Sequence, residues 1–591
     1  MNTIKNIKWL IPFIFTLLMT SSCSEDFLNR APTSALDQQQ VFSDIQLTRQ
    51  YQLRLYQTLR GGFQSFVNGD FTDSWGYDLI SNMDDYCMGS KNDNSTFEMI
   101  SGGWMNRGEN SNWGNAFEVA RKWRFSYQSI RAINIFLENY KNTPLATDAD
   151  RLEMKTMVGE AYFLRAHHYF ELVKRWGGVP LVYKVMQAND DQRPPRQNIK
   201  ICIDSIVSDC NKGAALMDIT VSSDQWLGRA TKGAAMGLKA RALLWGASQY
   251  WSSRGSGILW SDASKAALDV INLNVYSLMP NYRDVFLKTF NSEVIYCQNT
   301  APKNMWDLYM WVPNFLGGLT YGNFQPTQEF VDCYEIKDPS TGQYVNFDRN
   351  NPDHVANMYN KNRRDPRFNQ SMIYNGANWQ GITCQYYTGG NLGYQTVGSL
   401  ASYFYTGYCF TKYWDENVLV GTVNGVDRKG NPLLNWIFLR YADILLMYAE
   451  AQNQAGGPNT SADGSGKTAL WAINQVRERA GISDLPGSIS QADFDVKLRN
   501  ERSVELCIED QRFFDVRRWG IGEVLARDLH KVVCTKNLDG TFTYDYSQTV
   551  GPLRKKYDNP DQYILYPINI EEVQRNPNLT QNPGWQDVIR N

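Results

Sequence analysis

The chain has 591 residues, and 43% of them are hydrophobic, which is enough to bury a large core. Lys and Arg total 59 and Asp and Glu total 61, so the formal net charge is −2. A chain this close to neutral lacks the basic field that nucleic-acid binding requires, and nucleic acid is therefore excluded as an expected partner. Aromatic residues make up 13% of the chain, with 18 Trp and 33 Tyr, and many of them fall in segments with the composition of loops.

Residues 1–22 have the features of a secretory signal peptide. Lys5 and Lys8 provide a positive start, and an apolar run follows from residue 9 to residue 19. This run is too short to cross a bilayer, which takes ~20 apolar residues. We expect no later segment to span a membrane, because none is long and apolar enough.

Cys23 directly follows the small residues Ser21 and Ser22 at the end of this signal. Bacterial lipoproteins are cleaved and acylated at a cysteine in this position. We therefore expect Cys23 to carry a lipid that holds the protein on a membrane. Thr20 stands where such signals usually have Leu, so an ordinary cleavage site beside a cysteine remains the alternative.

Neither the cysteines nor the histidines form a recognisable metal site. The nine cysteines after Cys23 are an odd number without a C-x-x-C pair, which argues against a zinc site and a full disulfide framework. We expect most of them to be buried. His167 and His168 are adjacent on a predicted helix, so their side chains point about 100° apart and cannot face one metal. The sequence predicts no metal and no cofactor.

The segments 151–176 and 229–250 carry clear helical patterns. The apolar stripe of the first consists of Met157, Ala161, Leu164, His168 and Leu172. Aromatic residues fill much of its remaining surface, so we expect this helix to be covered on two sides. Glycines and alanines crowd the second segment, which predicts a neighbouring backbone packed very close to it.

Helical segments of this kind come in pairs along the chain. The expected pairs are 44–60 with 112–140, 151–176 with 198–217, 229–250 with 261–273, and 438–455 with 467–480. Residues 61–111, 280–437 and 520–591 are instead rich in Gly, Asn, Pro and aromatic residues. The sequence therefore predicts a mainly α fold, a tetratricopeptide-like scaffold of four helix pairs decorated by long loops. Such loops often carry function.

Three glutamates recur every fourth residue in the stretch ERSVELCIEDQRFFDVRRWG, at Glu501, Glu505 and Glu509. Paired carboxylates are what a glycosidase needs, but these normally come from different elements that flank a cleft. Arginines are interleaved with the glutamates here. We therefore interpret this stretch as a helix whose ion pairs tie it to its neighbours.

Aromatic residues cluster in three loop-rich segments. The clusters are Trp75, Tyr77, Trp104 and Trp113; Trp306, Tyr309, Trp311, Phe315 and Tyr321; and Trp379, Tyr386 and Tyr387. Polar residues that could bind hydroxyl groups stand nearby, at Asp70, Asp73, Asn82, Asp84, Asp85, Asn304 and Asn323. A sugar ring stacks its C–H face on a flat aromatic ring while its hydroxyl groups need polar partners. For any single aromatic residue, core packing remains the alternative.

Seven stretches, taken in chain order, resemble the SusD/RagB family of starch-utilisation-type outer-membrane lipoproteins. They are CSEDFLNRAP at 23–32, EAYFLRAHHYFELVKRWGGVPLV at 160–182, GRATKGAAMGLKARALLWGA at 228–247, LRYADILLMYAEAQNQAG at 439–456, INQVRERAGI at 473–482, RNERSVELCIEDQRFFDVRRWG at 499–520, and YPINIEEVQRNPNLTQNPGW at 566–585. The resemblance covers nearly the whole mature chain, which implies one SusD-like domain over residues 23–591.

This resemblance implies a non-catalytic, surface-exposed lipoprotein that binds oligosaccharides and closes as a lid over a SusC-like TonB-dependent transporter in the outer membrane. By position along the chain, the ligand-binding loops are expected within 61–111 and 280–437. The residues expected to contact the ligand are Trp75, Trp104, Trp306, Trp311, Tyr321 and Asp73. Two alternatives stay open: a peptide-binding lid of the same transporter type, and a glycoside hydrolase with two carboxylates facing each other across the aromatic cleft.

Overall fold

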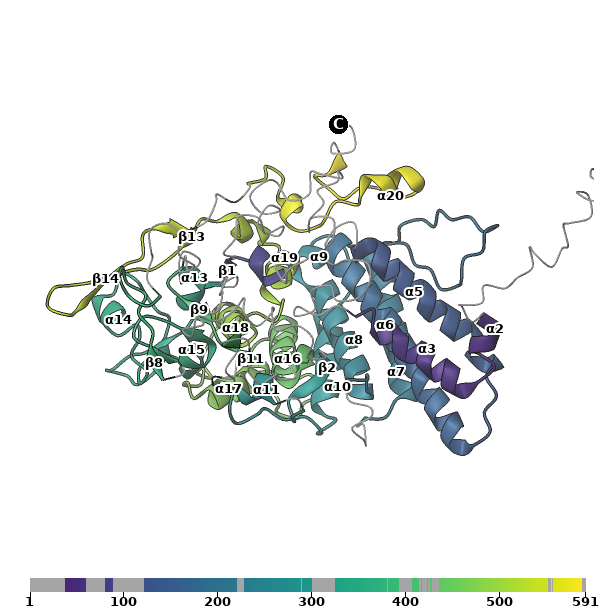
Figure 1. Ribbon diagram of the computed structural model, residues 1–591, viewed down its shortest axis with the longest axis horizontal. Helices are drawn as coiled ribbons and strands as arrows, with labels where there is room; N and C mark the ends of the chain where they lie inside the picture. The colour runs from purple at the N-terminus through teal and green to yellow at the C-terminus, as the bar shows by residue number, and fades with distance from the viewer. Residues whose placement is uncertain are drawn as a thin grey trace, which may run out of the picture.

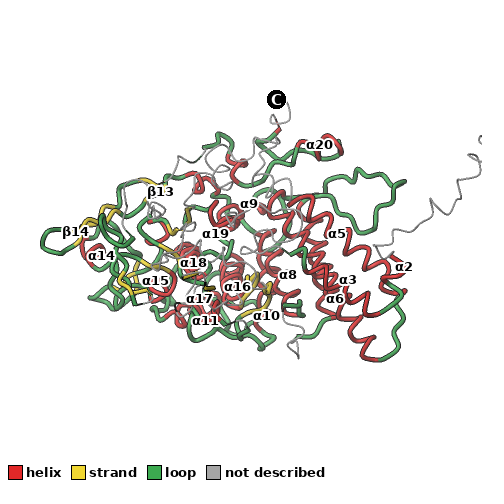
Figure 2. Tube along the Cα trace, in the orientation of Figure 1, coloured by secondary structure: helices red, strands yellow, loops and turns green. Residues whose placement is uncertain are grey.

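The computed structural model describes residues 38–59, 80–88, 122–219, 228–288, 290–299, 325–379, 381–392, 406–413, 416, 422–423, 426–427, 435–550, 554 and 556–586. Long helices gather in one half of the molecule, and short strands, short helices and loops make up the other half (Figures 1 and 2). Across these described stretches, every helix is too short or too polar to cross a bilayer.

The four predicted helix pairs are all present. They are α3 (Ile45–Tyr56) with α5 (Lys122–Asn139), α6 (Asp148–Trp176) with α7 (Ile199–Leu216), α8 (Lys232–Ala247) with α10 (Trp260–Ile271), and α16 (Tyr441–Gly456) with α17 (Ala469–Ala480). Each helix packs against its partner, and successive pairs pack through α5 and α6, α7 and α8, and α10 and α16. This serial packing of helix pairs is the tetratricopeptide-like arrangement that the sequence predicts.

Local sequence explains where the scaffold helices begin and end. Thr147 and Asp150 form a reciprocal capping box at the start of α6. Thr468 caps α17, and this helix ends at Gly481, whose φ of 77° suits a residue without a side chain. The stripe of α6 that begins at Met157 is buried. The aromatic residues on its other side are also buried, except Tyr162, which is partly exposed, and this confirms that α6 is covered on two sides.

The expectation of a close neighbouring backbone is wrong for α8. A methyl group on Gly237 would lie 2.2 Å from the side chain of Leu439, so the small residue there accommodates a side chain. Close backbone approach occurs instead between α6 and α7. A methyl group on Gly213 would lie 2.9 Å from the backbone oxygen of Gly159.

The remaining helices, apart from α18 with its 15 residues, are shorter than those of the scaffold, and most of them lie in the second half of the chain. They are α2 (Gln38–Val41), α9 (Gln249–Ser252), α11 (Asp284–Leu287), α13 (Gln328–Val331), α14 (Pro352–Ala356), α15 (Pro366–Ser371), α18 (Gln491–Glu505), α19 (Arg512–Arg518) and α20 (Ile570–Arg575), with 3₁₀ turns η2 (Ile80–Met83), η4 (Tyr140–Asn142), η7 (Gly522–Ala526) and η8 (Pro560–Tyr563).

The strands form antiparallel pairs. They are β1 (Cys87–Met88) with β3 (Gln325–Pro326), β2 (Val294–Asn299) with β12 (Asn435–Arg440), β4 (Ile336–Lys337) with β5 (Tyr344–Val345), β6 (Met372–Ile373) with β9 (Cys409–Phe410), β7 (Asn378–Trp379) with β8 (Ile382–Thr383), β10 (Thr422–Val423) with β11 (Val426–Asp427), β13 (Leu529–His530) with β16 (Thr549–Val550), and β14 (Val533–Lys536) with β15 (Phe542–Asp545).

Two hydrophobic cores meet along the β2–β12 pair. The larger core joins the scaffold helices to α19 and to the C-terminal segment that ends near Trp585. The smaller core lies under the strands and loops and is rich in aromatic residues such as Phe330 and Tyr408. Phe438, on β12, packs against both cores. The short β2–β12 pair therefore links the two halves of the molecule.

The stretch 499–520 is not one continuous helix, contrary to the interpretation of its glutamates as helical neighbours. Helix α18 ends at Glu505, and α19 begins only at Arg512. The carbonyl oxygen of Glu505 accepts hydrogen bonds from Arg440 and Lys412 rather than from the next helical turn. These long-range donors replace the hydrogen bond that would continue the helix.

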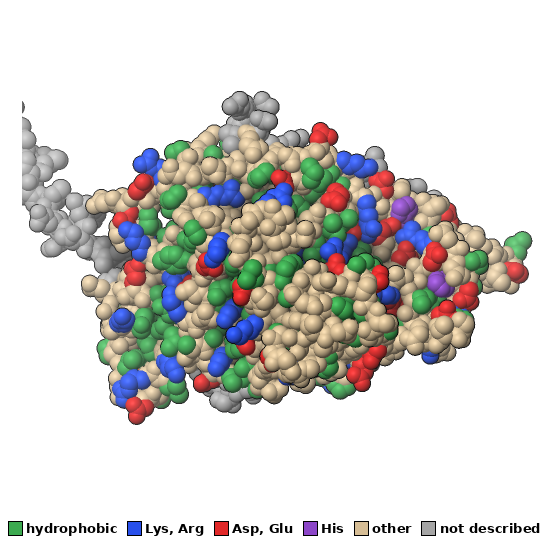
Figure 3. Space-filling view, turned by 180° about the vertical axis from the view of Figure 1, so that it is seen from behind, with side chains coloured by type: hydrophobic (Ala, Val, Ile, Leu, Met, Phe, Trp, Pro, Cys, Tyr) green, Lys and Arg blue, Asp and Glu red, His purple; other side chains and the backbone are tan. Residues whose placement is uncertain are grey.

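Basic and acidic side chains are mixed over the face of the molecule shown in Figure 3, without a broad area of one sign. This mixture fits the net charge of −2. A nucleic-acid groove would instead need a continuous basic strip.

Candidate functional site

The residues predicted to bind ligand or lipid lie outside the described stretches. They are Asp73 and Trp75 in 60–79, Trp104 in 89–121, Trp306, Trp311 and Tyr321 in 300–324, and Cys23 in 1–37. The structure does describe the residues at which these segments leave and re-enter the fold. Those residues show which segments start close together.

The chain enters segments 60–79 and 300–324 at neighbouring points. Leu59 is the last described residue before the first segment, and Gln298 lies on β2 just before the second. The side-chain amide of Gln298 donates a hydrogen bond to the backbone oxygen of Leu59 at 3.1 Å. The residues that lead into two segments far apart in sequence, each with predicted ligand contacts, therefore lie side by side.

A second junction joins the ends of three segments at Gln325. Met88 precedes segment 89–121, Gln325 follows segment 300–324, and Thr406 follows segment 393–405. Met88 and Gln325 are paired in the β1–β3 ladder. The backbone N–H of Thr406 donates to Oε1 of Gln325 at 3.0 Å. Neither Gln325 nor Thr406 stands in a periodic or motif-bearing stretch, so sequence pattern alone offers no signal for this junction.

The acidic residues next to β1 have structural roles, although the sequence suggested them as possible partners for sugar hydroxyls. Asp85 is buried and forms a two-point ion pair with Arg512. It also forms an ion pair with Arg527 through a single contact. Burial alone would raise the pKa of Asp85, but Arg512 and Arg527 outweigh it and lower the pKa. The carboxylate of Asp84 accepts the backbone N–H groups of Tyr86 and Cys87. The pKa of Asp84 is raised to about 8, mainly by burial and secondly by repulsion from Asp85.

The third aromatic cluster belongs mainly to the core. Trp379 and Tyr386 are only 3% and 2% exposed and pack in the smaller core. Tyr387 is partly exposed, and its ring lies 5.5 Å from that of Phe542 on the β14–β15 hairpin. For Trp379 and Tyr386, core packing is therefore the correct interpretation.

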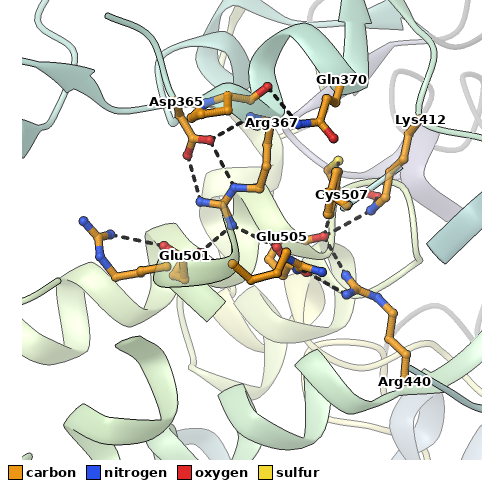
Figure 4. A network of polar contacts seen from close by, with 12 residues as sticks. Asp365, Arg367, Gln370, Lys412, Arg440, Glu501, Glu505 and Cys507 are labelled. Atoms are coloured by element: carbon orange, nitrogen blue, oxygen red, sulfur yellow. Dashed lines mark hydrogen bonds and ion pairs between the residues drawn. The ribbon is translucent and has the colours of Figure 1, made fainter. Parts of the chain in front are cut away.

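The three glutamates at the end of α18 and just after it lie in a buried ion-pair network. Figure 4 shows the part of this network around Glu501 and Glu505. Arg440 donates to Glu505 at 2.7 Å and to Glu509 at 2.8 Å. Arg367 joins Glu501 to Glu505, and Lys412 contacts Glu509 at 2.6 Å. The interpretation of the glutamates as ion-pairing residues is confirmed, but these partners come from distant parts of the chain rather than from the interleaved arginines.

This network does not have the properties of a glycosidase acid–base pair. Glu505 is fully buried, and both of its carboxylate oxygens are engaged by arginines. Burial alone would raise its pKa, but Arg479, Arg440 and Arg367 outweigh burial and hold the pKa of Glu505 well below its usual range. A general acid would need the opposite shift.

The two adjacent histidines are buried in the scaffold. Nε2 of His168 lies 3.0 Å from the hydroxyl oxygen of Thr58, and burial lowers the pKa of His167 to about 3. Among the described residues, no group of three or more His, Cys, Asp or Glu side chains is placed to hold a metal ion. All of the described cysteines except Cys333 are buried.

Comparisons with known proteins agree with this architecture. Two family models match the chain, one described as the SusD family over residues 292–585 and one described as starch-binding associating with outer membrane over residues 27–244. A SusD-like protein of Formosa agariphila is 22% identical, with 99% of this chain and 100% of that protein covered. A solved SusD-like protein of Bacteroides fragilis superposes with a TM-score of 0.73 at 27% identity, covering 94% of this chain and 100% of that one. A SusD-like carbohydrate binding protein of the same organism gives a TM-score of 0.68 at 23% identity over 91% and 100% of the two chains. The chain therefore belongs to the SusD/RagB family of carbohydrate-binding proteins, which associate with the outer membrane and have no catalytic activity of their own.

Proposed function

We propose that this protein captures oligosaccharides at the cell surface and delivers them to a SusC-like TonB-dependent transporter in the outer membrane. The observation that carries the proposal is the pair of junctions, Leu59 with Gln298 and Met88 with Gln325, in a member of a carbohydrate-binding family. They bring together the ends of segments that contain every predicted ligand contact. Delivery to a transporter predicts that an outer-membrane protein of the TonB-dependent class co-purifies with this chain after mild solubilisation.

The ligand surface in this proposal consists of aromatic rings with a carboxylate beside them. The contact residues are Trp75, Trp104, Trp306, Trp311, Tyr321 and Asp73. A stacked indole ring offers a large rigid surface and loses little side-chain entropy on binding, so its removal matters more than that of one rim hydroxyl contact. The tryptophans are therefore the residues to test.

Binding should be measured by calorimetry or affinity electrophoresis against plant, host and microbial polysaccharides, with peptides in the same panel. Truncating Trp75 or Trp306 to Ala should weaken glycan binding by about 1–3 kcal/mol, a tenfold to hundredfold effect. Trp104 and Trp311 are the next variants in the series. Trp260→Ala is the matched control, because Trp260 is partly exposed at the start of α10 in the helical scaffold.

The panel separates the possible outcomes. Binding to peptides and to no glycan would show that the ligand of this lid is a peptide. Full glycan affinity in all four tryptophan variants would place the ligand surface on other loops. Loss of binding in Trp260→Ala as well would point to general destabilisation.

The proposal includes a lipid anchor on Cys23. The motivation is the short apolar run followed by Ser21, Ser22 and Cys23. Cys23→Ala should abolish lipid labelling and move the protein from the membrane fraction to the soluble fraction, whereas Ser24→Ala should change neither. Membrane retention and intact labelling in Cys23→Ala would rule out this anchor.

A further inference from the structure

Gln325 contacts Met88 and Thr406, which flank two other segments of the chain, and it is not itself among the expected ligand contacts. We propose that Gln325 is a positioning residue that holds Met88 and Thr406 in a fixed relation to itself, these three being described residues that flank the segments 89–121, 300–324 and 393–405. The inference rests on the proposed function, because two of these segments contain predicted glycan contacts. In this proposal, Gln325 affects ligand affinity although it does not contact the ligand.

The backbone around Gln325 makes the first connection. Gln325 pairs with Met88, and Pro326 with Cys87, in the antiparallel β1–β3 ladder. Next along the chain, the N–H of Thr327 donates to the backbone oxygen of Tyr86 at 3.0 Å. The two-residue ladder is thus extended by a further hydrogen bond, which fixes its register.

The side chain of Gln325 makes the second connection. Its Oε1 accepts both the backbone N–H of Thr406 at 3.0 Å and the hydroxyl of Thr406 at 3.3 Å. Gln325 is 1% exposed, and Thr406 is fully buried. The carbonyl of Thr406 in turn accepts the N–H of Val532 at 3.0 Å. Hydrogen bonds between buried groups are costly to leave unmade, so these contacts hold the two segments firmly.

The junction rests on a rigid base. Asp85, just before β1, is held by Arg512 at the start of α19 and by Arg527. The side chain of Met88 packs with Leu529 and Val550 in a small separate hydrophobic cluster. Because the surroundings are fixed on both sides, a change at Gln325 is expected to loosen the junction rather than the scaffold.

The physical consequence is pre-organisation of the ligand surface. When the residues that flank a loop are held in a fixed relation, the loop has fewer conformations in the free protein and loses less conformational entropy on binding. Removing the Gln325 acceptor should therefore raise the entropy cost of ordering the ligand surface and so reduce glycan affinity. The contacts made to the glycan should change little. If Gln325 merely stabilised the fold, its substitution would lower the melting temperature. Ligand affinity measured well below the melting temperature would then be unchanged.

The test compares four variants in the full chain. Gln325→Leu keeps approximate volume and removes the acceptor, and Thr406→Val removes one of its two donors. Thr406→Ser keeps the hydroxyl and serves as the conservative rescue. Gln452→Leu is the matched control, because Gln452 is a buried glutamine with two hydrogen bonds, to Ser264 and Thr460, in the helical half.

Hydrogen exchange without ligand is the first readout. In Gln325→Leu, the Thr406 and Val532 amides should exchange on the order of tenfold faster than in the wild type, with the scaffold helices unchanged. Calorimetry on the glycan that the wild type binds is the second readout. Affinity should fall about tenfold in Gln325→Leu and less in Thr406→Val, with Thr406→Ser and Gln452→Leu near the wild type.

Each result supports or overturns the proposed positioning role of Gln325. Unchanged exchange at Thr406 and Val532, or wild-type affinity in Gln325→Leu despite faster exchange, would overturn it. If Gln325→Leu does not fold, the contrast between Thr406→Val and Thr406→Ser decides in its place. A wild-type protein that binds no glycan would overturn the proposed function, and the exchange comparison alone would then show whether Gln325 joins the three segments.

Discussion

The carboxylate of Glu505 receives hydrogen bonds from Arg367, Arg440 and Arg479, which come from three separate parts of the chain. Glu505 ends α18, Arg440 ends β12, and Arg367 belongs to α15 in the loop-rich half. One buried side chain therefore ties the scaffold to the second half of the molecule. Buried charges of this kind are stable only while every partner is present.

Glu505→Gln tests this structural role. The variant keeps the shape of the side chain but leaves several buried arginines with less compensating charge, so we expect the free energy of unfolding to fall by about 3–5 kcal/mol. Denaturant unfolding followed by circular dichroism measures it. Glu571→Gln is the control, because Glu571 forms an exposed pair with Arg575 and should have almost no effect. Ligand affinity should stay within about twofold of the wild type, and lost binding with unchanged stability would instead place Glu505 in the site.

The difference in unfolding free energy between the wild type and Glu505→Gln should depend on pH with a definite sign. The pKa of Glu505 is well below its usual range in the folded protein, so folding is favoured by its ionised form. This contribution is complete at neutral pH, above the unfolded pKa of about 4.3, and is lost as the pH falls toward the folded value. The gap between the wild type and Glu505→Gln should therefore be constant from pH 7 to pH 5.5 and narrow below about pH 4. A gap that widens on acidification would contradict the assignment.

At the scale of elements, long periodic segments were predictable and breaks caused by distant residues were not. The 3.6-residue pattern from Met157 to Leu172 predicts α6, and all four helix pairs follow from patterns of the same kind. The turn between α18 and α19 depends on Arg440 and Lys412, which lie far away in sequence, so local periodicity could not reveal it. The close backbone approach of α6 and α7 at Gly159 and Gly213 also depends on tertiary packing.

Gly213→Ala tests that close approach between α6 and α7. Alanine favours a helix over glycine by about 1 kcal/mol, but its methyl group would lie 2.9 Å from the backbone oxygen of Gly159. Neighbouring backbone cannot yield as a flexible side chain can, so we expect a net destabilisation of about 1–3 kcal/mol in denaturant unfolding. Gly487→Ala is the control, because a methyl group there meets nothing within 4 Å and should be neutral or slightly stabilising. A Gly213→Ala protein as stable as the wild type would show that the two helices can separate at little cost.

At the scale of the whole molecule, the segments that carry candidate site residues stay a prediction from sequence, and the contacts between the residues that flank them could not be predicted. Trp379 and Trp75 both lie in aromatic loop-rich stretches, yet Trp379 is a core residue. The Met88–Gln325 pairing joins residues that no local pattern relates, because strand pairing at long sequence separation is a tertiary property. The family resemblance also implied the overall architecture, which the helix pairs and the superposition on the solved SusD-like protein of Bacteroides fragilis confirm.

The C-terminal segment also returns to the helical scaffold, which bears on how the molecule unfolds. Trp585 is 1% exposed, packs in the larger core and donates its indole N–H to the backbone oxygen of Leu565 at 2.9 Å. Nearby, the N–H of Tyr566 donates to the carbonyl of Arg175 near the end of α6. The segment around Trp585 therefore completes a core that begins with the first described helices, and we expect this segment to unfold together with the helical scaffold.

Trp585→Ala tests this closure. Removing a fully buried tryptophan should cost about 3–5 kcal/mol, and it should shift the entire transition rather than detach a terminal segment. The measurement is thermal or denaturant unfolding followed by both helical circular dichroism and tryptophan fluorescence, whose midpoints should fall together. Leu538→Ala is the control, because Leu538 is fully exposed at the tip of the β14–β15 hairpin and should leave the midpoint unchanged. A normal helical transition preceded by a separate early fluorescence change would mean that the C-terminal segment unfolds independently of the scaffold.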